Sequence, residues 1–275
     1  MRRGAAPRAA LALAGLLVGA LVLSPYLVML LTAVKPAGEL RTSPPRLTPI
    51  DWQWGHFADV MRDPDFLTWL RVSLVVAAAS TALVLLAAVP AAYYTARHRF
   101  RGRTAFLFLV LVTQMFSPTA LVVGLHREFF ELDLINTYLA LVLTNAAFNL
   151  AFAVWLLRAF FASIPREIEE AAAVDGCGRL RVLWQIVLPV SRPGLVTALI
   201  FSFIAAWNEY IVALTLMTDP DKKTLTVGIT SYVTAYVQHW NSLFAASLIA
   251  IVPVVALFAL IERHLVAGLT AGSVK

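Results

Sequence analysis

A run of 26 uncharged residues, Ala9 to Val34, limits what this chain can fold into. A helix needs about 20 apolar residues to cross the hydrocarbon core of a membrane. Five further apolar runs follow, over residues 72–96, 104–125, 134–157, 194–217 and 242–261. Charged residues are 14% of the 275 positions, below the ~25% of soluble domains. We expect an all-α integral membrane protein, a single domain over residues 1–275 with six transmembrane helices.

The first apolar run, residues 9–34, has a second interpretation. Arg2, Arg3 and Arg8 precede it, as basic residues precede the apolar part of a secretory signal peptide. The run is long for that role, however, and no small-x-small cleavage pattern marks its end. We expect it to remain in the protein as the first membrane span.

Basic residues indicate how the chain is oriented. If the N-terminus is cytoplasmic, fourteen of the 22 Lys and Arg residues fall in cytoplasmic segments, in agreement with the positive-inside rule. Both termini are therefore predicted to be cytoplasmic. The cluster from Arg97 to Arg103 is interpreted as a solvated anchor at the lipid headgroups. Although the net charge is +6, the basic residues form no stripe of the kind that binds nucleic acid.

The loop between the fourth and fifth spans, residues 163–189, has the signals of a short helix. Pro165 is expected at its first position, and glutamates occupy its first turns. Gly176 is expected to end it in the left-handed conformation. An ordered cytoplasmic loop of this length favours a mechanical connector to a soluble partner. A plain amphipathic loop helix without a partner is the alternative.

Two apolar faces are predicted within this loop. Ile168, Ala171 and Ala172 form a narrow one that another surface can approach closely. A segment lying along the membrane surface follows, and its apolar residues are Leu180, Leu183, Trp184 and Val187. Pro189 and Pro193 are expected to end this segment and turn the chain into the fifth span.

A fixed pattern runs through the loop: Glu170, Ala171, Ala172, Gly176, Ile186, Leu188 and Pro189. It resembles the EAA loop of membrane subunits of binding-protein-dependent ABC importers. Other stretches, including "LINTYLALVL", "WLLRAFFASIPREIEEAA", "AAWNEYIVAL" and "GLTAGSVK", are similar to the maltose-type sugar permeases of that group. The resemblance covers essentially the whole chain.

The resemblance implies a type I ABC importer permease fold in the bacterial cytoplasmic (inner) membrane. It also implies three kinds of protein partner: a second homologous permease, two ATP-binding cassette subunits that use ATP and Mg, and an extracytoplasmic sugar-binding protein. The seven pattern residues would couple ATPase closure to alternating access, with Glu170 and the alanines meeting the ATPase. The cargo would be a carbohydrate: an oligosaccharide, a disaccharide, an amino sugar or a related polyol.

Polar residues within the spans are candidates for a substrate pathway or a gate: Trp207, Asn208, Glu209, Tyr210, Asn145 and Asn149. Glu209 is the only acid in the six runs, and a carboxylate at that depth should face the bundle interior or water. Hydrogen bonds between helices are the alternative role for Glu209 and for the two asparagines.

Other classes of membrane protein fit less well. The chain has no Gly-rich phosphate loop of the Walker type, so we expect it to bind no cofactor and to hydrolyse no ATP. Its five histidines and one cysteine lack metal-ligand spacing. An ion-coupled secondary transporter of a small polar solute is the alternative, and it would be expected to carry more buried acids and an internal repeat. A membrane enzyme would need a convergent acid-base or metal constellation.

Overall fold

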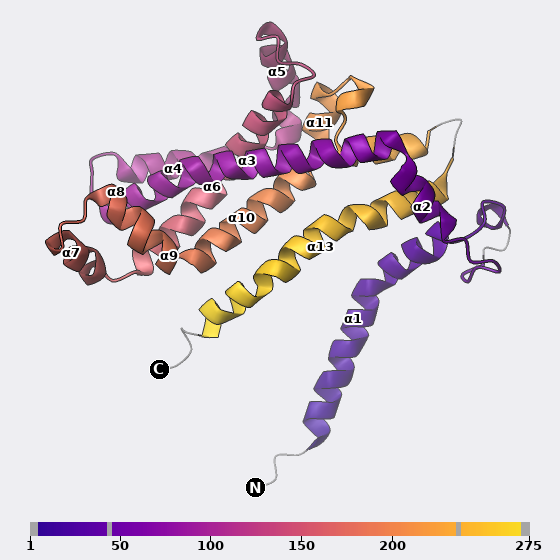
Figure 1. Ribbon diagram of the computed structural model, residues 1–275, viewed down its shortest axis with the longest axis horizontal. Helices are drawn as coiled ribbons and strands as arrows, with labels where there is room; N and C mark the ends of the chain where they lie inside the picture. Colours follow the sequence, from indigo (N-terminus) through magenta and orange to yellow (C-terminus); the bar gives the residue numbers. More distant parts are fainter. Residues whose placement is uncertain (1–4, 43–45, 235–237, 271–275) are drawn as a thin grey trace. The chain divides into compact units, whose positions relative to one another are not determined.

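Figure 1 presents the chain as a computed structural model in which residues 5–42, 46–234 and 238–270 are described. Arg2, Arg3, Lys275 and the end of the stretch "GLTAGSVK" lie outside the described residues. The described part consists of helices and turns, with an isolated β-bridge between Val233 and Gln238. The all-α prediction is therefore confirmed for the described residues.

The helices have the following bounds: α1 Ala5–Ala33, α2 Gly55–Arg62, α3 Pro64–Arg97, α4 Arg103–Thr113, α5 Pro118–Glu131, α6 Tyr138–Ser163, α7 Arg166–Val174, α8 Arg179–Val182, α9 Leu188–Val190, α10 Arg192–Trp207, α11 Ile211–Leu216, α12 Leu225–Gly228 and α13 Trp240–Thr270. Three further segments, η1 Glu39–Arg41, η3 Pro220–Lys222 and η4 Ile229–Tyr232, are 3₁₀ turns, and η2 Leu183–Val187 is a π-helical turn.

The chain divides into two compact units, of which the first comprises Met1–Leu67 and Ile229–Val252. It contains α1, whose large apolar side chains from Leu11 to Val28 are exposed, as lipid-facing side chains are. Polar contacts join the segments that follow. The Asn241 amide donates to the carbonyl of Lys35, and the Tyr232 hydroxyl donates to Asp63 at 2.8 Å.

The second unit, Thr68–Gly228 with Pro253–Lys275, is built on α3, α6 and α10. In Figure 1, α6 and α10 lie side by side, and they pack closely because Gly194 has no side chain. A Cβ atom at Gly194 would overlap the ring of Phe160. Apolar residues of all three helices form one core at the Ser163 end of α6, and a second core lies at its Tyr138 end.

Four of the described helices are long and apolar enough to cross a membrane: Leu11–Ala33 of α1, α3, α6 and Trp240–Leu260 of α13. They match the predicted first, second, fourth and sixth spans. Two bent helix pairs bring the number to as many as six, if each pair counts as one span. The prediction of membrane-spanning helices is thus confirmed in its coarse form.

The third and fifth spans are not the continuous helices that the sequence predicts. Helices α4 and α5 meet at 94°, because Pro118 starts α5 and the preceding Ser117 is extended, with ψ 131°. The fifth span ends its first helix, α10, at Trp207 and resumes as α11 only at Ile211. The predicted turn into that span is confirmed, since the segments on either side of Ser191 meet at 81°.

Candidate functional site

Helix α7 forms within the predicted EAA loop and ends where the sequence indicates. Gly176 has a φ of +80°, a conformation that costs glycine little. The N–H of Cys177 donates to the carbonyl of Ala172 at 3.0 Å, and the N–H of Gly176 donates to that of Ala173 at 3.1 Å. These two bonds make a Schellman cap. The start differs by one residue, because Pro165 is the cap and Arg166 the first helical residue.

The predicted small face of α7 divides between the interior and the surface. Ala172 is 6% exposed and belongs to the same core as Val182 and Leu183, so it presents little surface to a partner. Ala171 and Glu170 are exposed, and Ile168 is 41% exposed. Of the three EAA residues, α7 therefore exposes Glu170 and Ala171, whereas the sequence assigned Ala172 to the outer surface as well.

A cluster of charged and hydroxyl groups, which we call the Glu169 cluster, ties α7 to the end of α3. Nη2 of Arg97 lies 2.5 Å from Oε1 of Glu169, an ion pair without hydrogen-bond geometry, and the two side chains are 8% and 15% exposed. The hydroxyl of Tyr93 donates to Oε2 of Glu169 at 2.8 Å. Three side chains from two elements thus meet at a site largely shielded from solvent.

Two further hydrogen bonds fix the backbone around this cluster. Nη1 of Arg97 donates to the carbonyl of Ile164 at 3.1 Å, and Nη2 of Arg166 donates to the carbonyl of Arg97 at 3.2 Å. The end of α3, the end of α6 and the start of α7 are consequently held together. Arg97 therefore differs from its predicted role as a solvated anchor, a role that Arg99 and Arg101, both exposed, still fit.

An open cavity of about 220 Å³ adjoins the Glu169 cluster. Arg166, Glu170, Cys177 and Arg179 line it together with the cluster. Cys177 is a half-buried free thiol and the single cysteine of the chain. Water can thus reach the edge of an ion pair whose atoms are mostly covered.

The remaining pattern residues lie in the segment between Gly178 and Ser191. Ile186 is half-buried against the core, Leu188 is 9% exposed and Pro189 is half-buried. The helix widens to a π turn before Pro189, whose missing N–H removes the α-helical bond to Gln185. These residues attach the loop to the core of the second unit rather than forming an outer surface.

The same segment borders an apolar groove of about 560 Å³ between α3 and α10. Leu180 and Trp184, which line it, are 75% and 62% exposed, whereas the neighbouring Leu183 and Val187 are buried. The predicted apolar face therefore exists, with half of it packed against the protein and half of it uncovered.

Glu209 lies in the break between α10 and α11, where its carboxylate binds the backbone. Its two oxygens accept from the N–H of Val212 at 2.7 Å and of Ala213 at 2.9 Å. Those N–H groups are in the first turn of α11 and have no partner within the helix. The carboxylate thus acts as a helix cap, a role that the sequence did not suggest.

The other pathway candidates are dispersed. Trp207 is 5% exposed and stacks on Phe203, which leaves no free ring face for a ligand, while Asn208 is exposed and Tyr210 half-buried. Nδ2 of Asn145 donates to Leu141 of its own helix, and Nδ2 of Asn149 donates to Asn145. The bonds expected between helices are therefore bonds within α6.

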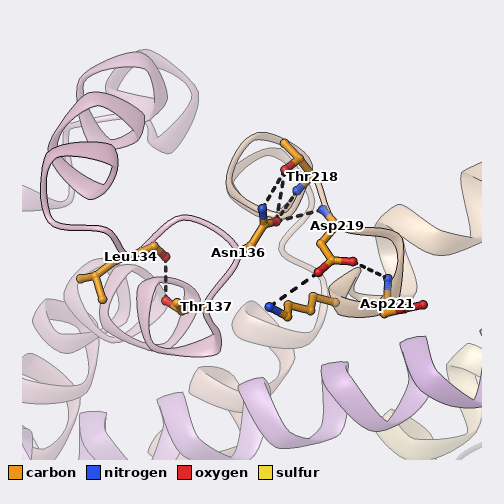
Figure 2. A network of polar contacts seen from close by, with 7 residues as sticks. Leu134, Asn136, Thr137, Thr218, Asp219 and Asp221 are labelled. Atoms are coloured by element: carbon orange, nitrogen blue, oxygen red, sulfur yellow. Dashed lines mark hydrogen bonds and ion pairs between the residues drawn. The ribbon is translucent and has the colours of Figure 1, made fainter.

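At the Tyr138 end of α6, a second polar network joins two loops (Figure 2). Asn136, with a φ of +58°, accepts through Oδ1 from the N–H of Thr218 at 2.8 Å and from that of Asp219 at 2.9 Å. Its Nδ2 donates to the hydroxyl of Thr218 at 2.9 Å. We call these three residues the Asn136 network. Among the described residues, no group of three or more His, Cys, Asp or Glu could hold a metal ion.

Comparisons with known proteins agree with these features. The family model described as "Binding-protein-dependent transport system inner membrane component" matches residues 84–270. An inner membrane ABC transporter permease protein of Escherichia coli is 35% identical over 257 residues, or 93% of this chain and 92% of that protein. The trehalose/maltose transport system permease protein of Thermococcus litoralis is 32% identical over 278 residues, or 100% of this chain and 99% of that protein.

A solved structure has the same fold. It is a chain of a bacterial ABC transporter involved in the import of the acidic polysaccharide alginate, with a TM-score of 0.81 and 22% identity over 96% of this chain and 99% of that one. The resemblance seen in the sequence is thereby confirmed. The chain belongs to the family of inner membrane components of binding-protein-dependent transport systems, as a permease of the ABC type.

Proposed function

We propose that this chain is a permease subunit of an ATP-driven importer that moves a carbohydrate from an extracytoplasmic binding protein into the cytoplasm. The observation that carries the coupling part of the proposal is α7, a short capped helix that offers Glu170 and Ala171 to the exterior while Ala172 fixes it to the core. The carbohydrate class is supported by the relative named for trehalose and maltose and by another named for diacetylchitobiose.

The importer would contain a second homologous permease, two ATPase subunits that use ATP and Mg, and the binding protein. The chain would have six spans and cytoplasmic termini, with α7 on the cytoplasmic side. The exposed Arg99 and Arg101 support this orientation, because basic residues collect on that side. Asn208 and Tyr210, at the break in the fifth span, would face the sugar pathway, and Glu209 would hold that break open by capping α11.

The role of α7 can be tested with two glycines that share a conformation. Gly176 has a φ of +80° and Gly102 one of +92°, and a Cβ at either position meets nothing within 4 Å. Replacing either by Val strains the left-handed backbone by about 1–2 kcal/mol, a factor of roughly 5 to 30 in an equilibrium. Only Gly176 sets the end of α7. Gly176→Val should lower the yield of ATPase subunits that co-purify with this chain, and Gly102→Val should not; equal yields would remove α7 from the interface.

The energy source separates this proposal from ion-coupled transport. With ATP held constant in reconstituted vesicles, uptake should continue in the presence of proton uncouplers and stop when ATP is removed. Uptake that stopped with uncouplers alone would identify a secondary transporter.

A further inference from the structure

Two neighbouring glutamates of α7 have opposite surroundings. Glu170 is exposed, whereas the side chain of Glu169 is 15% exposed and is held by Arg97 and Tyr93 of α3. Successive residues of a helix point about 100° apart, so one glutamate faces outward while the other faces the rest of the protein. The pattern shared with the family draws attention to Glu170, but the charged connection between α7 and α3 is made by Glu169.

Burying an ion pair adds little stability, because the cost of removing two charges from water offsets their attraction. Apolar side chains could hold α7 equally well, as Ala172 does one turn further along the same face. What the Glu169 cluster adds is a short connection between specific side chains, an ion pair and one hydrogen bond. It joins a helix of 9 residues to one end of α3, a helix of 34 residues.

The cluster also lies on a direct route from α7 to α3. Helix α3 extends about 51 Å, enough to reach from one membrane surface to the other. On its N-terminal side α7 is connected to α6 only through Ile164 and Pro165, and Arg97 binds the carbonyl of that same Ile164. Displacing α7 therefore pulls on Arg97, and through Arg97 on α3.

We propose that Glu169 is a positioning residue that transmits movement of α7 to α3 through Arg97. This inference rests on the proposed function, since it takes the ATPase subunits to be what moves α7. Glu170 and Ala171 then make the contact with the ATPase, and Glu169 passes the displacement to the second span. In the reverse direction, docking of the binding protein reaches the ATPase by the same route.

The test uses the complete transporter in proteoliposomes with the substitution Glu169→Gln. The amide is nearly the same size and keeps an acceptor for Tyr93, but it loses the attraction to Arg97. The measured quantity is the ratio of ATP hydrolysis with the binding protein to hydrolysis without it. We expect this stimulation ratio to fall on the order of tenfold while the ATPase subunits still co-purify.

Glu167→Gln is the matched control. Glu167 lies in the first turn of the same helix and is exposed, and its side chain makes no hydrogen bond or ion pair with the described residues. Its substitution removes the same charge from α7 and should leave the stimulation ratio unchanged. Tyr93→Phe removes only the hydrogen bond to Glu169, so its ratio should fall between those of the two glutamine variants.

Cys177 supplies a second measurement that does not depend on turnover. It lines the cavity beside the cluster and is the one cysteine of this chain, so labelling with a maleimide can be read on this subunit after gel separation. Glu169→Gln should raise the labelling rate several-fold as α7 separates from α3. Glu167→Gln should not.

The outcomes distinguish this inference from the function on which it rests. A normal stimulation ratio and normal labelling in Glu169→Gln would overturn the transmission role, whatever Gly176→Val does. Loss of the ATPase subunits from Glu169→Gln would also overturn it, because the cluster would then hold α7 in the position that docking needs rather than transmit its movement. If Gly176→Val loses the ATPase while Glu169→Gln changes neither ratio nor labelling, the docking role of α7 stands and the transmission role alone fails. If Gly176→Val retains the ATPase, the docking role fails, and the transmission role fails with it.

Discussion

At the Tyr138 end of α6 the adjoining loop is held by an amide, whereas at the Ser163 end it is held by an ion pair. The Asn136 network binds mainly backbone N–H groups, which carry no net charge and do not titrate. The Glu169 cluster binds one side chain to another across two helices, beside a cavity that water can enter. These ends are about 39 Å apart, since α6 has 26 residues.

The difference suggests which end moves. Breaking the Asn136 network removes the acceptor of two backbone N–H groups, those of Thr218 and Asp219. An ion pair at the edge of a cavity can exchange its partner for water at a smaller cost, because both charges regain hydration. We therefore expect a static joint at the Asn136 network and a mobile joint at the Glu169 cluster.

The largest effect is expected from Arg97→Ala. The substitution leaves the Glu169 carboxylate in a covered site without its cation. Removing one partner of a buried ion pair lowers the free energy of unfolding by about 3–5 kcal/mol. The melting temperature of the purified complex should fall clearly. Arg101→Ala, at an exposed position of the same basic cluster, is the control and should melt like the wild type. Equal melting temperatures for the two variants would mean that the ion pair between Arg97 and Glu169 is not formed.

The sequence predicted the features of the EAA loop that depend on residues near one another. A glycine after a helical run indicates a left-handed cap, and Gly176 is one; two prolines indicated the turn that occurs at Ser191. The same local reasoning failed for Arg97. Its neighbours in sequence are basic and predict a lipid anchor, while its partner Glu169 is in a distant segment.

The candidate pathway was predicted less well, for a related reason. A lone acid in an apolar run indicates an important carboxylate, but the sequence does not say whether it binds a ligand or its own backbone. Glu209 does the latter because the helix breaks beside it, and an apolar run of 24 positions, residues 194–217, gave no signal for that break. The bend before α5 did have a signal, Pro118, which the surrounding apolar residues obscured.

An intermediate effect is expected at Asn136, where two substitutions separate conformation from hydrogen bonding. Asn136→Gly still adopts the positive φ easily but loses the side-chain hydrogen bonds, which should lower the free energy of unfolding by about 1–2 kcal/mol. Asn136→Ala also strains the left-handed backbone, for a total of about 2–4 kcal/mol. Thermal unfolding should therefore rank wild type, Gly, then Ala. Because this joint is expected to be static, neither variant should change the stimulation ratio of the folded transporter, and a changed ratio would show that this end moves as well.

The smallest effect is expected at Glu209, and it decides between the two roles that the sequence left open. Loss of a helix cap costs about 1 kcal/mol, so Glu209→Ala should lower the melting temperature slightly. Glu209→Gln keeps one acceptor oxygen for the N–H groups of Val212 and Ala213 and should lower it less. If capping is its main role, transport should follow the same order, with Gln close to wild type. A Gln variant that melts like the wild type but fails to transport would instead indicate that the charge of Glu209 acts on the sugar pathway, and the break in the fifth span would then be a binding site rather than a capped bend.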